Sequence, residues 1–173
     1  MSKRLLFALL LCVTWGSGSL LASADTLVVV VRHAEKAADD PRDPSLSAAG
    51  QARATALAKV LADCPLTSAL VSEYRRTRQT AEPALRGRDL SARVIPVNQD
   101  SAEAYAQRLA GLVKREHPGG AVLVVSHSNT VPALVLALAG VQVPPILEAS
   151  EFDRLYLIVL PAQGRPRLIA ARY

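Results

Sequence analysis

Two histidines stand at the ends of two apolar runs in the sequence. His33 follows the run 26–31 with Arg32 beside it, and His127 closely follows the run 121–125. A neutral imidazole is a good nucleophile, and a guanidinium group binds phosphate oxygens through a planar fork of donors. Side chains of these types could therefore carry phosphoryl transfer, in which one imidazole attacks and the other groups neutralise charge.

A group of arginines follows a third apolar run, 67–71. The stretch 72–81 reads Ser-Glu-Tyr-Arg-Arg-Thr-Arg-Gln-Thr-Ala and contains Arg75, Arg76 and Arg78. Ligands of open α/β sheets bind at the carboxyl ends of the strands, so we expect these arginines at the same edge as the two histidines. The third histidine, His117, ends a predicted helix and is interpreted as a solvated helix-terminal residue.

Other kinds of chemistry find less support in the sequence. A histidine after a strand often has a structural role only, and a pair of histidines can also bind zinc. No third histidine, cysteine or His-x-x-x-His spacing supports a zinc site. The phosphate-binding patterns GxxxxGK[ST] and GxGxxG are absent as well. The residues alone thus leave phosphoryl chemistry and a structural role open, and they predict no metal.

The elements that must position these residues alternate between strands and helices. Ser47 and Ser101 are predicted helix N-caps, and Pro83 is expected to kink its helix. The predicted strands are 26–31, 67–71, 93–97, 121–125, 155–160 and 167–171, and the predicted helices are 48–62, 77–85, 102–116 and 131–139. The last two strands are expected to form a hairpin. This alternation predicts a three-layer α/β fold, with a mostly parallel sheet and helices on both faces.

The first 24 residues have the layout of a secretory signal. Lys3 and Arg4 precede the apolar run 5–13, and small residues, Ala22 and Ala24, stand where a signal peptidase reads. The run is shorter than the roughly 20 residues that span a bilayer. We therefore expect a cleaved signal at 1–24, a single domain at 25–173 and a periplasmic or secreted protein without a stable membrane anchor.

The composition of the chain narrows the functional classes. Half of the 173 residues are hydrophobic, which excludes a disordered chain. The net charge of +5 falls to +3 without residues 1–24, and the basic residues are scattered, so no nucleic-acid partner is expected. Cys64 then remains as a lone cysteine, which excludes an internal disulfide and is interpreted as a packing residue. The oligomeric state is not predicted.

Four motifs follow one another along the chain after residue 24. They are Arg-His-Ala-Glu at 32–35, Leu-Ser-Ala-Ala-Gly-Gln-Ala at 46–52, the arginine-rich stretch 72–81 and Ser-His at 126–127. In these motifs the chain resembles the histidine phosphatase superfamily, in its phosphoglycerate mutase-like branch. Ala34 and Ser128 stand where the family commonly has glycine. Both are small residues, so the backbone can still approach a phosphate.

The resemblance implies roles for individual residues. His33 would be the nucleophile that forms a phosphohistidine, and Arg32, Arg76 and His127 would complete the phosphate pocket. Arg76 fits the family's Arg-x-x-x-Thr spacing better than Arg75 does. Asp100 would be the proton donor, with Glu103, Glu82 or no acid at all as the alternatives. The expected substrate contacts are Lys36, Ser128 and Asn129.

The sequence therefore predicts an exported phosphatase that hydrolyses a small phosphomonoester through a phosphohistidine on His33. It is expected to need neither metal nor cofactor, because arginines and histidines supply the positive charge. Two alternatives remain: a phosphate- or sugar-phosphate-binding module without turnover, and a phosphomutase. The mutase is disfavoured because the chain is short for such enzymes and lacks their larger insertions.

Overall fold

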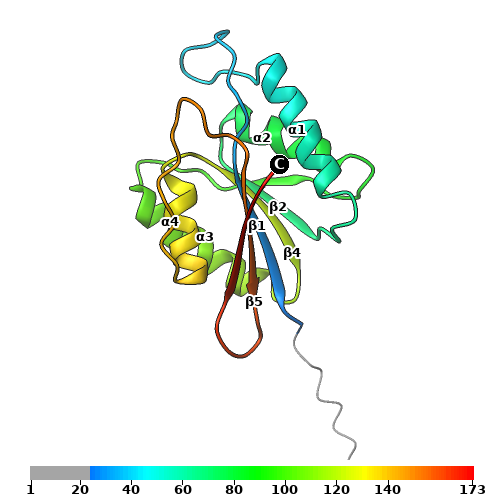
Figure 1. Cartoon of the computed structure of the whole chain (residues 1–173), viewed down its shortest axis with the longest axis vertical. Coiled ribbons are helices and arrows are strands. Elements are labelled where there is room, and N and C mark those ends of the chain that lie inside the picture. The colour runs from blue at the N-terminus through cyan, green and yellow to red at the C-terminus, as the bar shows by residue number, and fades with distance from the viewer. Residues whose placement is uncertain (1–23) are drawn as a thin grey trace, which may run out of the picture.

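The computed structural model describes residues 24–173, so the predicted signal lies outside the described residues except for Ala24. No helix in this part of the chain is long and apolar enough to cross a membrane. Figure 1 shows the elements in space. In chain order they are β1 (Thr26–Arg32), α1 (Ala48–Val60), β2 (Ser68–Val71), α2 (Arg75–Leu85), β3 (Ala92–Val94), α3 (Ala102–Glu116), β4 (Ala121–Ser126), α4 (Thr130–Ala139), β5 (Arg154–Leu160) and β6 (Arg167–Arg172).

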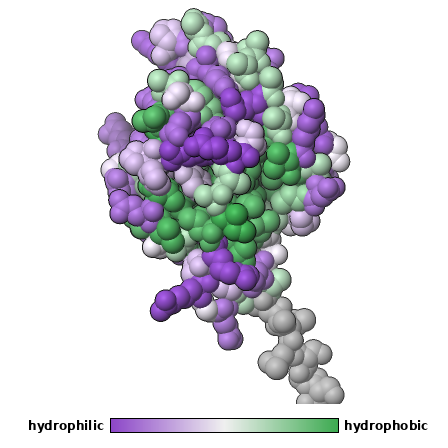
Figure 2. Space-filling view, in the orientation of Figure 1, coloured by the Kyte–Doolittle hydropathy of each residue, from purple (hydrophilic) through white to green (hydrophobic). Residues whose placement is uncertain are grey.

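The six strands form one sheet in the order β3-β2-β4-β1-β5-β6. The pairs β3-β2, β2-β4 and β4-β1 are parallel, whereas β5 runs antiparallel to β1 and pairs with β6 as the predicted hairpin. The hairpin turn therefore lies at the end of the sheet opposite to the carboxyl ends of β1 and β4. Figure 2 shows hydrophilic residues gathered at this lower tip. The predicted α/β fold with a mostly parallel sheet is confirmed.

Helices cover both faces of the sheet, as Figure 1 shows. In β1, Val28 and Val30 belong to the core that α3 and α4 close, whereas Val29 and Val31 belong to the core that α1 and α2 close. All four valines are completely buried. Because neighbouring residues of a strand face opposite sides, a central strand covered on both faces must be apolar throughout. This explains the unbroken apolar runs at 26–31 and 121–125.

The main difference from the sequence prediction is at the start of α2. This helix begins at Arg75, two residues earlier than predicted, so that Arg75 and Arg76 lie in its first turn. The backbone N–H of Arg75 donates to Oδ1 of Asp43 at 2.8 Å. The first N–H groups of a helix have no partner within the helix, so Asp43, from a loop distant in sequence, supplies an acceptor for one of them. β3 is shorter than predicted, and Pro96, which lacks an N–H, lies just beyond it.

The start of α1 is held against the loop that follows His33. The hydroxyl of Ser47 accepts from the N–H of Gly50, and the N–H of Ser47 donates to the carbonyl of Glu35 at 3.0 Å. A Cβ on Gly50 would lie only 2.3 Å from that carbonyl oxygen. Gly50 therefore permits a backbone approach that no other residue allows, and this approach fixes the loop behind the first histidine.

We expect Gly50→Ala to lower the free energy of unfolding by about 1–3 kcal/mol, because the Glu35 backbone must move. The matched control is Gly111→Ala in α3, where the added Cβ would meet only the movable end of the Arg115 side chain. Helix propensity predicts that this change leaves stability equal or raises it by up to about 1 kcal/mol. Urea unfolding of both variants measures the difference. Equal stabilities would contradict the close approach at Gly50.

Candidate active site

The carboxyl ends of β1 and β4 bring His33 and His127 together. Arg32 lies opposite Ser126 in the parallel ladder, and the N–H of His33 donates to the carbonyl of Ser126 at 2.9 Å. The two imidazole rings are 5.3 Å apart between centroids, at an interplanar angle of 65°. The two histidines therefore belong to one site.

The surroundings of His33 determine its protonation state. Its Nδ1 lies 2.8 Å from the carbonyl of Ala34. A carbonyl oxygen only accepts hydrogen bonds, so Nδ1 carries the proton and Nε2 keeps the free lone pair. Burial lowers the pKa of His33 to about 3, and the nearby His127 and Arg76 act in the same direction. His33 is therefore neutral near pH 7, with its lone pair on Nε2, as a nucleophile requires.

His127 is held by a chain of hydroxyl groups. Its Nε2 lies 3.0 Å from Oγ of Ser72, which lies 3.0 Å from Oγ1 of Thr77. The Thr77 hydroxyl also reaches the carbonyl of Tyr74, at 2.8 Å. It also lies 3.1 Å from the carbonyl of Ser72, and its proton must go to a carbonyl because carbonyl oxygens only accept. Ser72 therefore donates to Thr77, and His127 donates from Nε2 to Ser72. Nδ1 of His127 is thus left for a ligand. Burial, with Arg76 and Arg32 nearby, lowers its pKa to about 4.

Arg76 reaches the site from the first turn of α2. Its guanidinium lies 4.1 Å from the ring centroid of Tyr74, a cation–π contact, and its Nη1 is 3.9 Å from Oδ1 of Asp43. Its Nε is buried without a hydrogen-bond partner among the described residues. Burial also lowers the pKa of Arg76. Since an unpaired buried donor costs free energy, this atom is suited to an anionic ligand.

Arg32 is bound more tightly than the sequence indicates. It is 1% exposed and lies 4.0 Å over the ring of Phe152. Its Nη1 donates to the carbonyls of Glu151 (2.9 Å) and Leu147 (3.3 Å), and its Nη2 donates to the carbonyl of Glu148 at 2.8 Å. Only Nε lacks a partner in the described part of the chain. Three of its five N–H groups thus hold the segment 147–151, and Nε–H and the second N–H of Nη2 are left for an anion.

A cavity of about 400 Å³ opens over these side chains. Six of the predicted site residues line it, whereas Arg32 and Asp100 do not. Four further lining residues were not predicted, among them Tyr74, whose ring meets that of His127 edge-on at 5.4 Å. The lining residues are His33, Lys36, Tyr74, Arg76, Val97, His127, Ser128, Asn129, Thr130 and Glu148.

The acids proposed as proton donors are not gathered around the histidines. Oδ2 of Asp100 lies 2.6 Å from Nη2 of Arg108, and Glu82 pairs with Arg86 along α2. Glu103 lines a neighbouring cavity instead. The carboxylate that does line the histidine cavity is Glu148, 3.5 Å from Nζ of Lys36, and no sequence motif marks it.

Other sequence interpretations can be compared with the described residues. Arg75 is ion-paired with the aspartates of the loop 39–43, as expected for an arginine that does not bind phosphate. Ser72, which orients His127, was not predicted as a site residue, and its place in the arginine-rich stretch was its only signal. No cluster of three or more His, Cys, Asp or Glu side chains within residues 24–173 could hold a metal ion.

Comparison with known proteins shows which family has residues like those of this site. Residues 28–102, which include His33 and Arg76, match the family model of the histidine phosphatase superfamily (branch 1). The solved structure of the protein histidine phosphatase SixA complexed with tungstate is 25% identical, with a TM-score of 0.66 over 84% of this chain and 96% of SixA. The family match and this likeness support the histidine phosphatase superfamily for this chain.

Two further solved structures share the fold of this chain. The mycobacterial glucosyl-3-phosphoglycerate phosphatase is 18% identical, with a TM-score of 0.66 over 86% of this chain and 99% of that one. A phosphoserine phosphatase from Entamoeba histolytica is 15% identical, with a TM-score of 0.62 over 86% and 97%. A search of curated protein sequences gave no significant match. The superfamily and these neighbours support phosphatase activity in broad terms.

The lowered pKa values of His33 and His127 predict a specific pH dependence. Both imidazoles should stay neutral in NMR titrations from pH 8 down to 5, where an ordinary histidine, with a pKa near 6.5, takes up a proton. Since the unfolded chain binds these protons and the folded chain does not, the free energy of unfolding should fall as the pH drops from 6.5 to 5. His33→Ala should weaken that slope. Midpoints near 6.5 for both rings would contradict the burial argument.

Proposed function

We propose that this protein is a phosphatase that hydrolyses a phosphomonoester through a phosphohistidine on His33. The observation that carries the proposal is the state of His33: Nδ1 is bound to the Ala34 carbonyl, burial keeps the ring neutral, and Nε2 is left with its lone pair. An unpaired donor of Arg76 in the same cavity supports an anionic ligand there.

The proposed reaction has two steps. First, Nε2 of His33 attacks phosphorus, the new N–P bond forms, and the P–O bond to the leaving alcohol breaks. Arg76 stabilises the charge on the phosphoryl oxygens during this step, and His127 does so when it takes up a proton at Nδ1. Second, water attacks the phosphorus, the N–P bond breaks with its electron pair returning to Nε2, and inorganic phosphate leaves. In the first step the leaving oxygen takes up a proton from solvent water, or from Asp100 once this carboxylate has left Arg108 and is itself protonated.

Export and metal independence are part of the same proposal. The layout of residues 1–24 supports a cleaved secretory signal and a domain that begins near Asp25. The chain provides positive charge around the histidines through Arg32, Arg76 and Lys36, which is the role that a divalent ion has in other phosphatases. The proposed substrate is small and phosphorylated.

The nucleophile can be tested by trapping the intermediate. We expect a rapid quench in alkaline detergent, after mixing with a ³²P-labelled aryl phosphate, to leave acid-labile, base-stable label on the wild-type chain. His33→Ala should carry no label and release no phosphate, while it unfolds as cooperatively as the wild type. Both assays are run in EDTA, where the wild type should keep full activity. Phosphate release by His33→Ala would rule out this mechanism, and phosphate binding without turnover in the wild type would favour a binding module.

A second test separates charge from geometry at the arginines. Arg76→Lys keeps the charge but replaces a rigid planar group with a point donor, so we expect kcat to fall by about two orders of magnitude. Arg75→Lys has the same net charge, and Arg75 bonds to the loop 39–43 outside the cavity, so its kcat should change far less. Steady-state kinetics on one phosphomonoester compares the two. The reverse order of damage would mean that Arg75, not Arg76, binds the phosphoryl group.

A further inference from the structure

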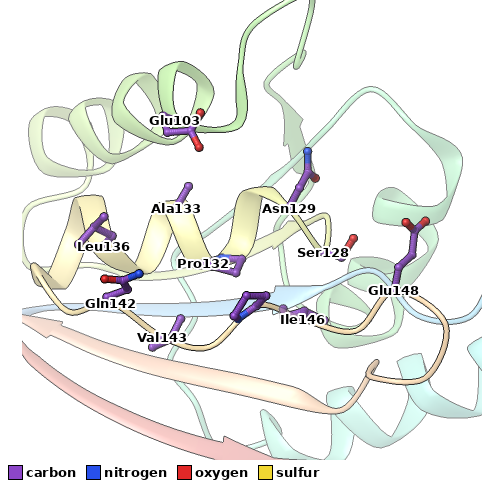
Figure 3. A pocket seen from close by; sticks show the side chains of 11 residues that line it. Glu103, Ser128, Asn129, Pro132, Ala133, Leu136, Gln142, Val143, Ile146 and Glu148 are labelled. Atoms are coloured by element: carbon purple, nitrogen blue, oxygen red, sulfur yellow. The ribbon is translucent and has the colours of Figure 1, made fainter.

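A second cavity adjoins the one that holds the histidines. Its volume is about 470 Å³, and Ser128, Asn129 and Glu148 line both cavities. Figure 3 shows it between the first turn of α3, the outer face of α4 and the segment 142–148. A molecule whose phosphoryl group lies at His33 would therefore extend past Ser128 and Asn129 into this second space.

The floor of the second cavity is apolar. Leu136 is 49% exposed there, so the fold leaves a hydrophobic side chain open to solvent on this face. Bound apolar groups would be favoured on such a surface because they remove it from water. The apolar lining residues are Pro132, Ala133, Leu136, Val143, Pro145 and Ile146.

The charges around this floor are negative. Glu103 and Glu148 are its charged lining residues, and no lysine, arginine or histidine of the described chain lines it. Glu148 already faces Lys36 at 3.5 Å, on the side of the histidine cavity. Glu103 comes from the opposite wall, in the first turn of α3, and forms no ion pair with the described residues. The uncompensated charge of the cavity is thus at Glu103.

We propose that the second cavity binds the alcohol part of the substrate and selects an apolar body that ends in a cationic group facing Glu103. This inference rests on the proposed phosphatase function and adds the substrate class to it. A carboxylate or second phosphate in the same position would meet Glu103 and lose its hydration without gaining a partner. The phosphoryl end and the alcohol end of the substrate would therefore meet opposite charges.

Three matched aryl phosphates test this selectivity. They are 4-ethylphenyl phosphate, whose side chain is neutral, the phenolic phosphate ester of tyramine, which is cationic, and that of 3-(4-hydroxyphenyl)propanoate, which is anionic. In the two charged esters the charge is separated from the ring by two carbons, so that the three phenol leaving groups are nearly equivalent. We expect kcat/KM for the cationic ester to exceed that for the anionic one at least tenfold. Glu103→Gln should remove most of this ratio, and Glu103→Lys should invert it.

The control for long-range charge is Asp63→Lys. Asp63 is exposed in the connection between α1 and β2 and lines neither cavity, and its replacement changes the net charge as much as Glu103→Lys does. It should leave the ratio unchanged. Calorimetric binding of the same three esters to His33→Ala gives the preference without turnover, so that failure of the phosphatase proposal would show separately as absent phosphate release.

Two results would overturn the assignment. One is equal kcat/KM and equal affinity for the three esters, with no effect of Glu103→Gln on the ratio. The other is an equal loss of kcat for all three esters in Glu103→Gln, which would identify Glu103 as a proton donor instead of a selectivity residue.

Discussion

The pairing of β1 with β4 is the constraint on which the site depends. In this register Arg32 lies opposite Ser126. His33 directly follows Arg32 and His127 directly follows Ser126, so the two histidines leave the sheet side by side. A shift by one residue would turn the side chains of β1 to the other face of the sheet and separate the two rings. Val28 to Val31 and the whole of β4 are buried between two cores, so the register is fixed by packing on both faces.

The same burial sets the electrostatics of the site. Desolvation lowers the pKa values of His33 and His127, and the neighbouring guanidinium groups lower them further. Two guanidinium Nε atoms are meanwhile left without partners in the described structure. Buried guanidinium donors without a partner cost free energy. A bound phosphoryl group relieves this cost because its negative charge meets the donors, and the same charge favours protonation of His127 at Nδ1.

Local patterns in the sequence predict the central strands, the helices and the histidine pair, because these depend on runs of residue types. They do not predict contacts between distant segments. The early start of α2 depends on Asp43, 32 positions before the N–H it accepts from, and the protonation of His127 depends on Ser72, 55 positions away. The family resemblance points to Asp100 as the proton donor, yet the partner of its carboxylate is Arg108 on the following helix. Such pairings depend on tertiary geometry, which spacing alone does not contain.

The segment 147–151 links the site proposed for phosphoryl chemistry to the cavity proposed for the alcohol part of the substrate. Arg32, next to the proposed nucleophile, binds three of its carbonyl groups, and Glu148 from this segment lines both cavities. The segment is further ordered by Glu151, which accepts from the N–H of Leu147 and pairs with Arg154. These two interactions lower the pKa of Glu151 to about 2. The wall of the substrate cavity is therefore anchored on the residue beside His33, so a change in Arg32 would alter selectivity and catalysis together.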